Sequence, residues 1–240
     1  MTELIYQLDS YCKDFDAHVL AVNPEFNAIQ LDRTCIYPGG GGQPFDKGSL
    51  STDGTDLHFM RARTIHGEHW HVLESSQNLP EIGSSVHGSI DWEYRHQLMR
   101  THTAMHILCG VIFRDYGAQV TGGDMQALEA RMDFEFETLS KELIGVIEEA
   151  VNKEVQQAHP IRVKILPREE AFQIPDLIRT KINLLPEHIS EIRTVEIVGL
   201  DLQADGGTHV ANSSEVGHIR ISDYKSKGKI NKRIYVSIED

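Results

Sequence analysis

The sequence predicts an α+β fold in which strands and helices mix without regular β-α-β alternation. The first ninety residues alternate apolar and polar side chains in short runs that are separated by turn residues. Two later segments instead carry apolar residues at helical spacing, and further alternating runs follow each of them. A chain of 240 residues has room for one large domain or two modest ones.

Residues 1–90 are predicted to be a β-rich domain. The alternating runs and the turns between them fall at residues 17–22 and 28–31, and at 23–24, 38–42, 53–54 and 66–67. Short strands at this spacing are typical of a small barrel or a curled sheet. We therefore expect a small β-barrel-like domain, with a boundary at Asp91.

Four consecutive glycines, Gly39–Gly42, interrupt this domain and are followed by Gln43. Glycine has a high entropic cost of ordering and favours neither helix nor strand. The run is either a flexible turn or a place where the backbone approaches a ligand closely. In the second interpretation Gln43 presents its amide to that ligand.

Residues 91–116 are predicted to form the main helix, after a strand at 85–90 and before Gly117, which is placed to end it. His102 and His106 lie four residues apart within it, so their Cβ atoms are roughly 5–6 Å apart on one face. Both imidazoles can therefore bind one metal ion. This spacing alone is weak evidence, because paired histidines on a half-buried helix are more often core residues.

A third histidine, His209, follows about a hundred residues later in the turn Gly206-Gly207-Thr208-His209. Glycines let the backbone bend tightly beside a site. Two ligands from a rigid helix, a third from a distant loop and one open position are the layout of a catalytic zinc site. The sequence therefore predicts a metal site between a helix and a loop.

The remaining segments predict an α/β-mixed domain over residues 91–240. The expected elements are a strand at 130–136, an amphipathic helix at 140–158, a strand at 161–165, a short helix at 168–172, a strand at 192–198 and a final basic hairpin from 219.

The chain resembles the AlaX family of free-standing alanyl-tRNA editing proteins, which are similar to the editing domain of alanyl-tRNA synthetase. The resemblance rests on Arg-Thr-His-Thr-Ala-Met-His at 100–106, Asp-Leu-Gln-Ala-Asp-Gly-Gly-Thr-His at 201–209 and the glycine-rich stretch at 37–48, which looks like that of the two-domain members. It implies a zinc-dependent hydrolase that removes serine, or glycine, from mischarged tRNA(Ala). It also implies His102, His106 and His209 as zinc ligands.

One position departs from the family pattern, which most often has a cysteine as the fourth zinc ligand where this chain has Asp205. A carboxylate oxygen can bind zinc at about 2.0–2.2 Å, and the loss of a thiolate leaves a harder metal. Asp205 could instead orient a histidine or cap the tight turn. We interpret it as a ligand or a near-ligand.

The resemblance implies roles for further residues. Thr121 matches a threonine that lines the amino-acid pocket, where a hydroxyl can distinguish serine from alanine; an ordinary strand threonine is the alternative. Asp201 and Gln203 are expected to position water. Gly41, Gly42 and Gln43 are expected to assist substrate selection or to bind the tRNA end.

The first domain contains three closely spaced histidines, His66, His69 and His71. Their spacing is compatible with a metal site. On a strand, His69 and His71 share one face and Trp70 takes the other. Because the related proteins have a hairpin without metal here, we interpret all three as surface histidines.

The formal net charge is −13, which argues against broad neutralisation of nucleic-acid phosphates. A local basic stretch from Arg220 includes Lys225, Lys227 and Lys229, which could hold a tRNA end weakly. The alternative is a solvated hairpin whose lysines protect an exposed strand.

Three cysteines without Cys-x-x-Cys spacing are typical of reduced, cytoplasmic thiols, and the sequence has no apolar run long enough to span a bilayer. We therefore expect a cytoplasmic protein with tRNA(Ala) as partner and no membrane; the sequence sets no oligomeric state. Two other functions stay open: a non-catalytic tRNA-binding module and a metallohydrolase of another small ester.

Overall fold

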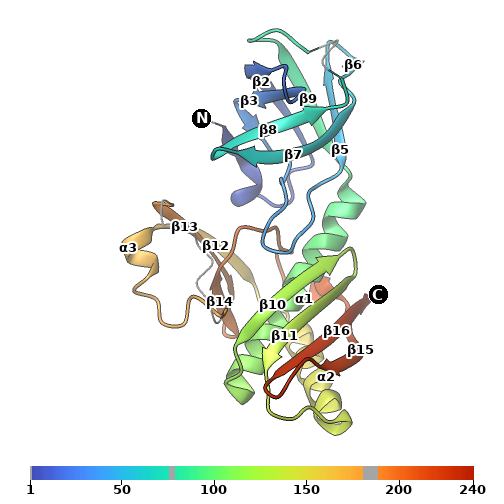
Figure 1. Ribbon diagram of the computed structural model, residues 1–240, viewed down its shortest axis with the longest axis vertical. Coiled ribbons are helices and arrows are strands. Elements are labelled where there is room, and N and C mark those ends of the chain that lie inside the picture. The colour runs from blue at the N-terminus through green and yellow to red at the C-terminus, as the bar shows by residue number, and fades with distance from the viewer. Residues whose placement is uncertain (1, 76–78, 181–188) are drawn as a thin grey trace. The chain divides into compact units, whose positions relative to one another are not determined.

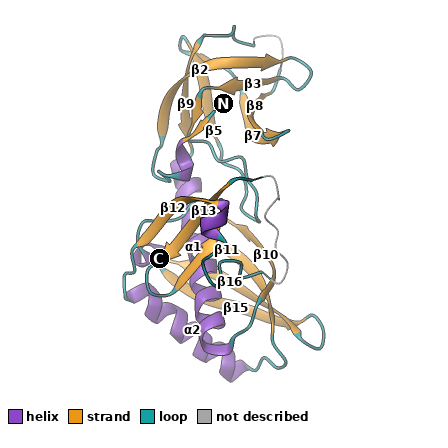
Figure 2. Cartoon of the chain, turned by 90° about the vertical axis from the view of Figure 1, so that its left-hand side faces the viewer, coloured by secondary structure: helices purple, strands orange, loops and turns teal. Residues whose placement is uncertain are grey.

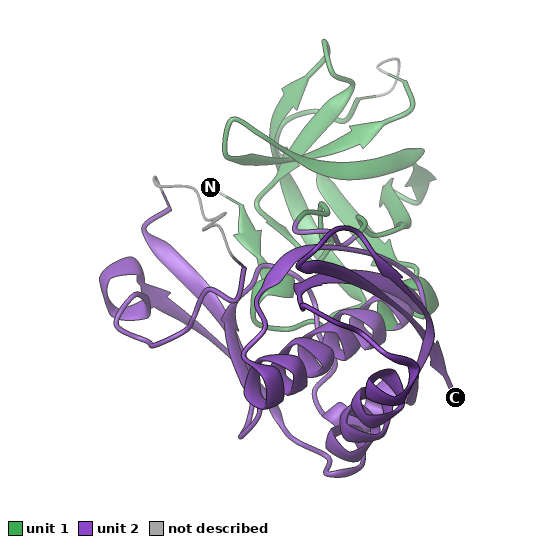
Figure 3. Ribbon diagram, turned by 60° about the horizontal axis from the view of Figure 1, so that its bottom comes forward, with its two compact units in different colours: residues 1–40, 44–96 green, residues 41–43, 97–240 purple. Residues whose placement is uncertain are grey.

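The computed structural model describes residues 2–75, 79–180 and 189–240, and among them the fold is α+β, with three α-helices and a larger number of strands (Figure 1). The chain divides into two compact units (Figure 3): residues 1–40 with 44–96, and residues 41–43 with 97–240. Within the described residues, no helix has the length and apolar character needed to cross a membrane.

The first unit consists almost wholly of strands (Figure 2). They are β1 (Glu3–Leu4), β2 (Asp14–Asn23), β3 (Ala28–Leu31), β4 (Arg33–Thr34), β5 (Gly48–Thr52), β6 (Thr55–Asp56), β7 (Phe59–Ile65), β8 (Glu68–Leu73) and β9 (Ser85–Ile90). Seven of them form one sheet in the order β6-β5-β9-β2-β3-β8-β7, and β1 pairs with β4 in parallel.

Strand β2 connects the two halves of this sheet. Its first half pairs with β9 and its second half with β3, with an irregularity in the register between Val19 and Ala21. Phe15, Ala17 and Val19 point inward from it, as the alternation predicts. The pairings of the described strands leave β6 and β7 at the two edges, so closure into a barrel stays a prediction.

The first unit contains a buried ion pair. Arg95 is fully buried and donates from Nε to Asp46 Oδ1 at 2.7 Å, and from Nη2 to the carbonyl oxygen of Cys35 at 2.7 Å. Asp46 also accepts from the backbone N–H of Tyr37 at 2.6 Å. A buried charge pair persists where its remaining hydrogen bonds are satisfied, as they are here.

The prediction that the histidines of the β7–β8 hairpin lie on the surface is confirmed for His66 and wrong for His69 and His71. The latter two are 6% and 0% exposed. His71 Nε2 lies 2.9 Å from Thr34 Oγ1, and the ring of His69 lies 5.9 Å from that of Tyr6. The alternation correctly placed the two on one face, but that face lies against the core of the first unit.

The second unit holds both long helices (Figure 2). Its elements are α1 (Trp92–Tyr116), which begins in the first unit, β10 (Val120–Gln126), β11 (Glu129–Glu135), α2 (Lys141–Gln156), β12 (Ile161–Pro167), α3 (Arg168–Ala171), β13 (Glu191–Ile197), β14 (Asp201–Ala204), β15 (His218–Ser226) and β16 (Asn231–Glu239). The strands form an antiparallel sheet β10-β11-β16-β15 and a smaller sheet β12-β13-β14.

Helix α1 is the central element of the second unit. Gly117 ends it, with φ of 64° and its N–H bonded to the carbonyl of Phe113 at 2.9 Å, as predicted. From Thr101 to Ile112 every residue is buried, so the helix is covered on all sides rather than on one face. At Gly110 an added Cβ would lie 3.0 Å from Asp201 Cβ, which shows how closely the start of β14 approaches the helix.

Candidate metal centre

Helix α1 places His102 and His106 one turn apart, with ring centroids 5.1 Å from each other. Both are 6% exposed. The helix is held at this level by two threonines: Thr101 Oγ1 accepts from the N–H of Leu128, and Thr103 Oγ1 accepts from the N–H of Val210. The second of these bonds ties the helix to the residue that follows His209.

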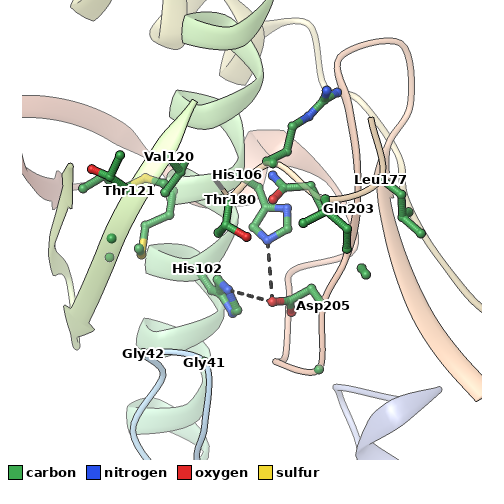
Figure 4. A pocket seen from close by; sticks show the side chains of 18 residues that line it. Gly41, Gly42, His102, His106, Val120, Thr121, Leu177, Thr180, Gln203 and Asp205 are labelled. Atoms are coloured by element: carbon green, nitrogen blue, oxygen red, sulfur yellow. Dashed lines mark ion pairs between the residues drawn. The ribbon is translucent and has the colours of Figure 1, made fainter. Parts of the chain in front are cut away.

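The loop after β14 brings Asp205 and His209 to the same place. Asp205 Oδ1 accepts from the N–H of Gly207 at 2.7 Å, which forms the tight turn that one interpretation of the sequence expected. Its other oxygen, Oδ2, faces His102 and His106 (Figure 4). Asp205 therefore caps the turn and faces the histidines at the same time.

Four potential ligand atoms converge. Asp205 Oδ2 lies 3.5 Å from His102 Nε2 and 3.9 Å from His106 Nε2, and Asp205 Oδ1 lies 4.0 Å from His209 Nε2. One donor atom from each residue lies within 4.8 Å of all the others. Two donors bound to one tetrahedral zinc at about 2.0–2.1 Å would be roughly 3.3–3.4 Å apart.

Besides the distances between the donor atoms, the burial of His209 indicates a metal ion. His209 is 3% exposed, and its Nε2 is buried without a hydrogen-bond partner among the described residues. A buried polar atom that lacks a partner is costly, and a cation at the centre of the group would satisfy it. Three imidazoles with one carboxylate are a donor set that suits zinc, although iron and manganese accept the same donors.

The protonation of the group is set by burial and by two carboxylates. Burial lowers the pKa of His102 to about 4 and that of His209 well below its usual value, so both rings stay neutral. Burial also lowers the pKa of His106, but Asp201 and Asp205 outweigh it and raise the value to about 9. The carboxylates thus favour one positive charge at this place, which a bound metal would supply instead of a proton.

Asp201 and Gln203 both come from β14 and lie on the Nδ1 side of His106. Asp201 is fully buried at its side chain, with Oδ2 3.3 Å from His106 Nδ1 and 2.6 Å from Gln203 Nε2. Arg179 donates from Nε to Asp201 Oδ1 at 3.2 Å, and its guanidinium lies 3.9 Å from the centre of the Phe113 ring. Arg179 carried no signal in the sequence, because it lies in an irregular stretch far from any motif.

A cavity of about 710 Å³ opens beside these residues within the second unit (Figure 4). Its polar end is formed by His102, His106 and Asp205, and Gly41 and Gly42 contribute backbone to its wall. The rest of the lining consists of six apolar residues, four polar residues and three glycines: Met105, Val120, Met132, Leu177, Ile178 and Ala204; Thr121, Arg179, Thr180 and Gln203; and Gly122, Gly123 and Gly206. A concave apolar pocket with a few convergent polar groups is the usual form of a small-ligand site.

The other predicted residues are placed as follows. Thr121 lines the cavity, but it is exposed, its hydroxyl donates to Asn231 Oδ1 at 3.1 Å, and in Figure 4 it points away from the two histidines. Lys225, Lys227 and Lys229 are exposed on β15 and the turn after it. Gln43 is 3% exposed and bonds to Thr208 in the loop of residues 205–209, here called the metal loop, rather than pointing to solvent.

Comparisons with known proteins identify the family of the chain. Residues 192–235 match the family described as threonyl and alanyl tRNA synthetase second additional domain, and residues 7–94 match tRNA synthetases class II (A). The alanyl-tRNA editing proteins AlaX-M of Methanosarcina barkeri and Saccharolobus solfataricus are 36% and 37% identical, each over 100% of both chains. The chain therefore belongs to the AlaX-M family of alanyl-tRNA editing proteins.

A longer relative shows the same likeness over part of its length. The alanine–tRNA ligase of Pyrococcus furiosus is 36% identical over 223 residues, which are 92% of this chain and 24% of the ligase. The resemblance to alanyl-tRNA editing proteins that the motifs predicted is thereby confirmed.

Proposed function

We propose that this protein is a trans-editing hydrolase that uses a bound zinc ion to remove serine, or glycine, from mischarged tRNA(Ala). The observation that carries the proposal is the convergence of His102, His106, Asp205 and His209 at the polar end of an apolar cavity, in a chain of the alanyl-tRNA editing family. In this proposal residues 91–240 form the editing domain and the protein acts in the cytoplasm without ATP.

The protein's own residues would prepare the site in two ways. His102 and His209 stay neutral because they are buried, so their nitrogens can bind a metal. Asp205 supplies a negative charge that offsets the cation. When bound, zinc can lower the pKa of water toward about 7 or polarise an ester carbonyl.

The cavity would hold the aminoacyl end of the tRNA. Its apolar wall suits the terminal nucleoside, and the glycines 41 and 42 let the backbone lie close to it. The Thr121 hydroxyl donates to Asn231 and keeps lone pairs that can accept from a seryl hydroxyl, which an alanyl group lacks. Gln203, which lines the cavity, is the group that would hold water near the ester, and the buried carboxylate of Asp201 would orient the Gln203 amide through their 2.6 Å hydrogen bond.

The basic hairpin would contact the tRNA phosphates. Asn231, at the start of β16, bonds to Thr121 at the cavity, so the turn that carries Lys227 and Lys229 lies near its rim. Lys232 takes no part, because it is 6% exposed and its Nζ donates to the carbonyls of Gly228 and Lys229. Three exposed lysines suit a weak, salt-dependent contact.

The test is deacylation by purified protein of known metal content, with seryl-tRNA(Ala) and alanyl-tRNA(Ala) as substrates, in the presence and absence of a chelator. We expect rapid loss of the seryl ester that the chelator stops, while the alanyl ester is spared. Unchanged esters with metal bound would contradict the proposal and favour a tRNA-binding module or a different ester substrate.

A further inference from the structure

Gln43 follows the glycine run yet its side chain is turned into the second unit. It is 3% exposed, and both ends of its amide are bonded to one residue of the metal loop. Oε1 accepts from the backbone N–H of Thr208 at 3.0 Å, and Nε2 donates to Thr208 Oγ1 at 2.9 Å. The preceding carbonyl, that of Gly42, accepts from the N–H of Met125 at 3.3 Å, which holds the backbone in place.

These contacts fix the orientation of the amide. A backbone N–H can only donate, so the Gln43 atom that faces the N–H of Thr208 must be the oxygen. The same oxygen lies 2.9 Å from His102 Nδ1. Since two acceptors cannot form a hydrogen bond with each other, Nδ1 of His102 must carry a proton.

The tautomer of His102 follows directly. In a neutral imidazole one nitrogen carries the proton and the other carries the lone pair. With the proton on Nδ1, the lone pair is on Nε2, which lies 3.5 Å from Asp205 Oδ2 and faces the metal centre. The oxygen of Gln43 thus selects the form of His102 that can bind a metal.

We propose that Gln43 is a positioning residue that fixes the tautomer and the ring orientation of His102 for metal binding. This inference rests on the metal centre of the proposed function, but not on the identity of the ester that is cleaved. It differs from the role expected from the sequence, in which the amide of Gln43 faces the substrate. Partners of this kind at ligand histidines commonly change metal affinity 10- to 100-fold when removed, as order-of-magnitude values.

The position of Gly207 shows that the side chains of Gln43 and His102 have little room to move. A Cβ added at Gly207 would lie 2.4 Å from Gln43 Oε1 and 2.4 Å from His102 Cε1. The backbone of the metal loop therefore packs directly against the hydrogen bond between them. Nδ1 of His209 likewise faces an oxygen, the carbonyl of Gly207 at 3.2 Å. Nδ1 of His106 lies 3.3 Å from Asp201 Oδ2 as an ion-pair contact and is buried without a hydrogen-bond partner among the described residues.

The experiment compares Gln43→Met with Gln43→Glu. Methionine has a similar volume but cannot accept from His102, whereas glutamate keeps an acceptor for both His102 and Thr208. Zinc affinity is measured for the full-length variants by competition with a chromogenic chelator, and the cobalt-substituted proteins are compared by absorption spectroscopy. We expect Gln43→Met to bind zinc about 10- to 100-fold more weakly, and Gln43→Glu to stay within about threefold of wild type.

A second measurement needs no variant and so does not depend on the folding of Gln43→Met. Long-range ¹⁵N–¹H spectra of the zinc-loaded wild-type protein report which nitrogen of each imidazole carries a proton. We expect the proton of His102 on Nδ1; a proton on Nε2 would overturn the inference.

The outcomes separate this inference from the proposed function. Equal zinc affinity in wild type and Gln43→Met would overturn the role of Gln43 and leave the metal centre intact. Weak zinc binding by both variants would show that Gln43 acts through packing alone, and would also overturn it. A wild-type protein that binds no zinc would overturn the metal centre and this inference together.

Discussion

The protein contains two pairs of buried histidines that differ in their surroundings. In the first unit, His69 and His71 lie among apolar residues, with Thr34 and the ring of Tyr6 as neighbours. In the second unit, His102 and His106 face His209 and the carboxylate of Asp205. Among the described residues, only the second pair belongs to a group of donors that could hold a metal ion.

The contrast shows that burial and spacing do not by themselves make a metal site. Burial lowers the pKa of His69 to about 4 and that of His71 to about 3, and neither shift has a carboxylate among its causes. His69 Nε2 and His71 Nδ1 are buried without hydrogen-bond partners in the part of the chain that the structure describes. What distinguishes the second pair is negative charge nearby and oxygen atoms that orient each ring.

The largest expected effect, on zinc binding and deacylation, comes from removing one histidine of the second pair. Removing one histidine of the first pair is the matched comparison. His106→Ala should weaken zinc binding and seryl-tRNA(Ala) deacylation by at least about 100-fold, because a direct ligand matters more than the groups that orient it. His71→Ala, the matched control, should leave zinc affinity unchanged and lower the thermal stability of the first unit. Metal analysis and a deacylation assay on both variants check this, and full activity in His106→Ala would contradict the proposed function.

The next effect is the loss of folding stability at low pH that the buried His69 and His71 cause. The folded-state pKa values of His69 and His71 lie below the ordinary value of 6.5. The unfolded state therefore binds more protons as the pH falls, and stability that is complete above pH 6.5 declines as the pH approaches 4. At pH 5 the loss is about 2 kcal/mol for each histidine, about 4 kcal/mol together.

Urea unfolding of the first unit at several pH values measures this loss. His69→Phe keeps an aromatic ring beside Tyr6 but cannot be protonated, so about half of the pH dependence should disappear. An identical pH dependence in wild type and variant would show that His69 is protonated in the folded state.

A smaller effect on zinc affinity should follow from removing the Asp201 carboxylate, which lies beside His106. Without it the surroundings of the second pair resemble those of the first pair more closely. Asp201→Asn removes the charge that lies 3.3 Å from His106 Nδ1 but keeps an oxygen acceptor there. We expect zinc affinity to fall about 10- to 100-fold, measured by chelator competition. Unchanged affinity would mean that the negative charge of Asp201 does not contribute to metal binding.

The smallest effect concerns the hairpin lysines, which lie in neither cluster. Replacing Lys225, Lys227 and Lys229 together by alanine should raise KM for tRNA severalfold, leave kcat unchanged and flatten the dependence on salt. Lys141→Ala, an exposed lysine on α2, is the control. A change in kcat with KM unaffected would contradict a role in binding phosphates.

Periodicity allowed much of the second unit to be predicted. Helix α1, strand β11 and the amphipathic helix α2 follow from spacing and end signals in the sequence. Ser140 caps α2 by accepting from the N–H of Leu143. The pairing of His102 with His106 follows from helical geometry, and the motif of the loop identified His209. These features depend on residues that are close in sequence.

The features that the sequence did not reveal depend on tertiary contacts. Alternation placed His69 and His71 on one face of a strand, but it could not tell that this face lies inside the first unit. The inward turn of Gln43 depends on contacts with His102 and Thr208, which lie 59 and 165 positions away. Arg179 contributes through contacts with Asp201 and the Phe113 ring, which lie 22 and 66 positions away, and no local pattern marks it.

Anomalous diffraction at the zinc absorption edge, on crystals of zinc-loaded wild-type protein, tests the central claim most directly, because it locates every bound zinc ion without assuming an activity. The account predicts a peak among the Nε2 atoms of His102, His106 and His209 and the carboxylate of Asp205, and none beside His69 and His71. A peak at the first pair with none at the second would contradict it.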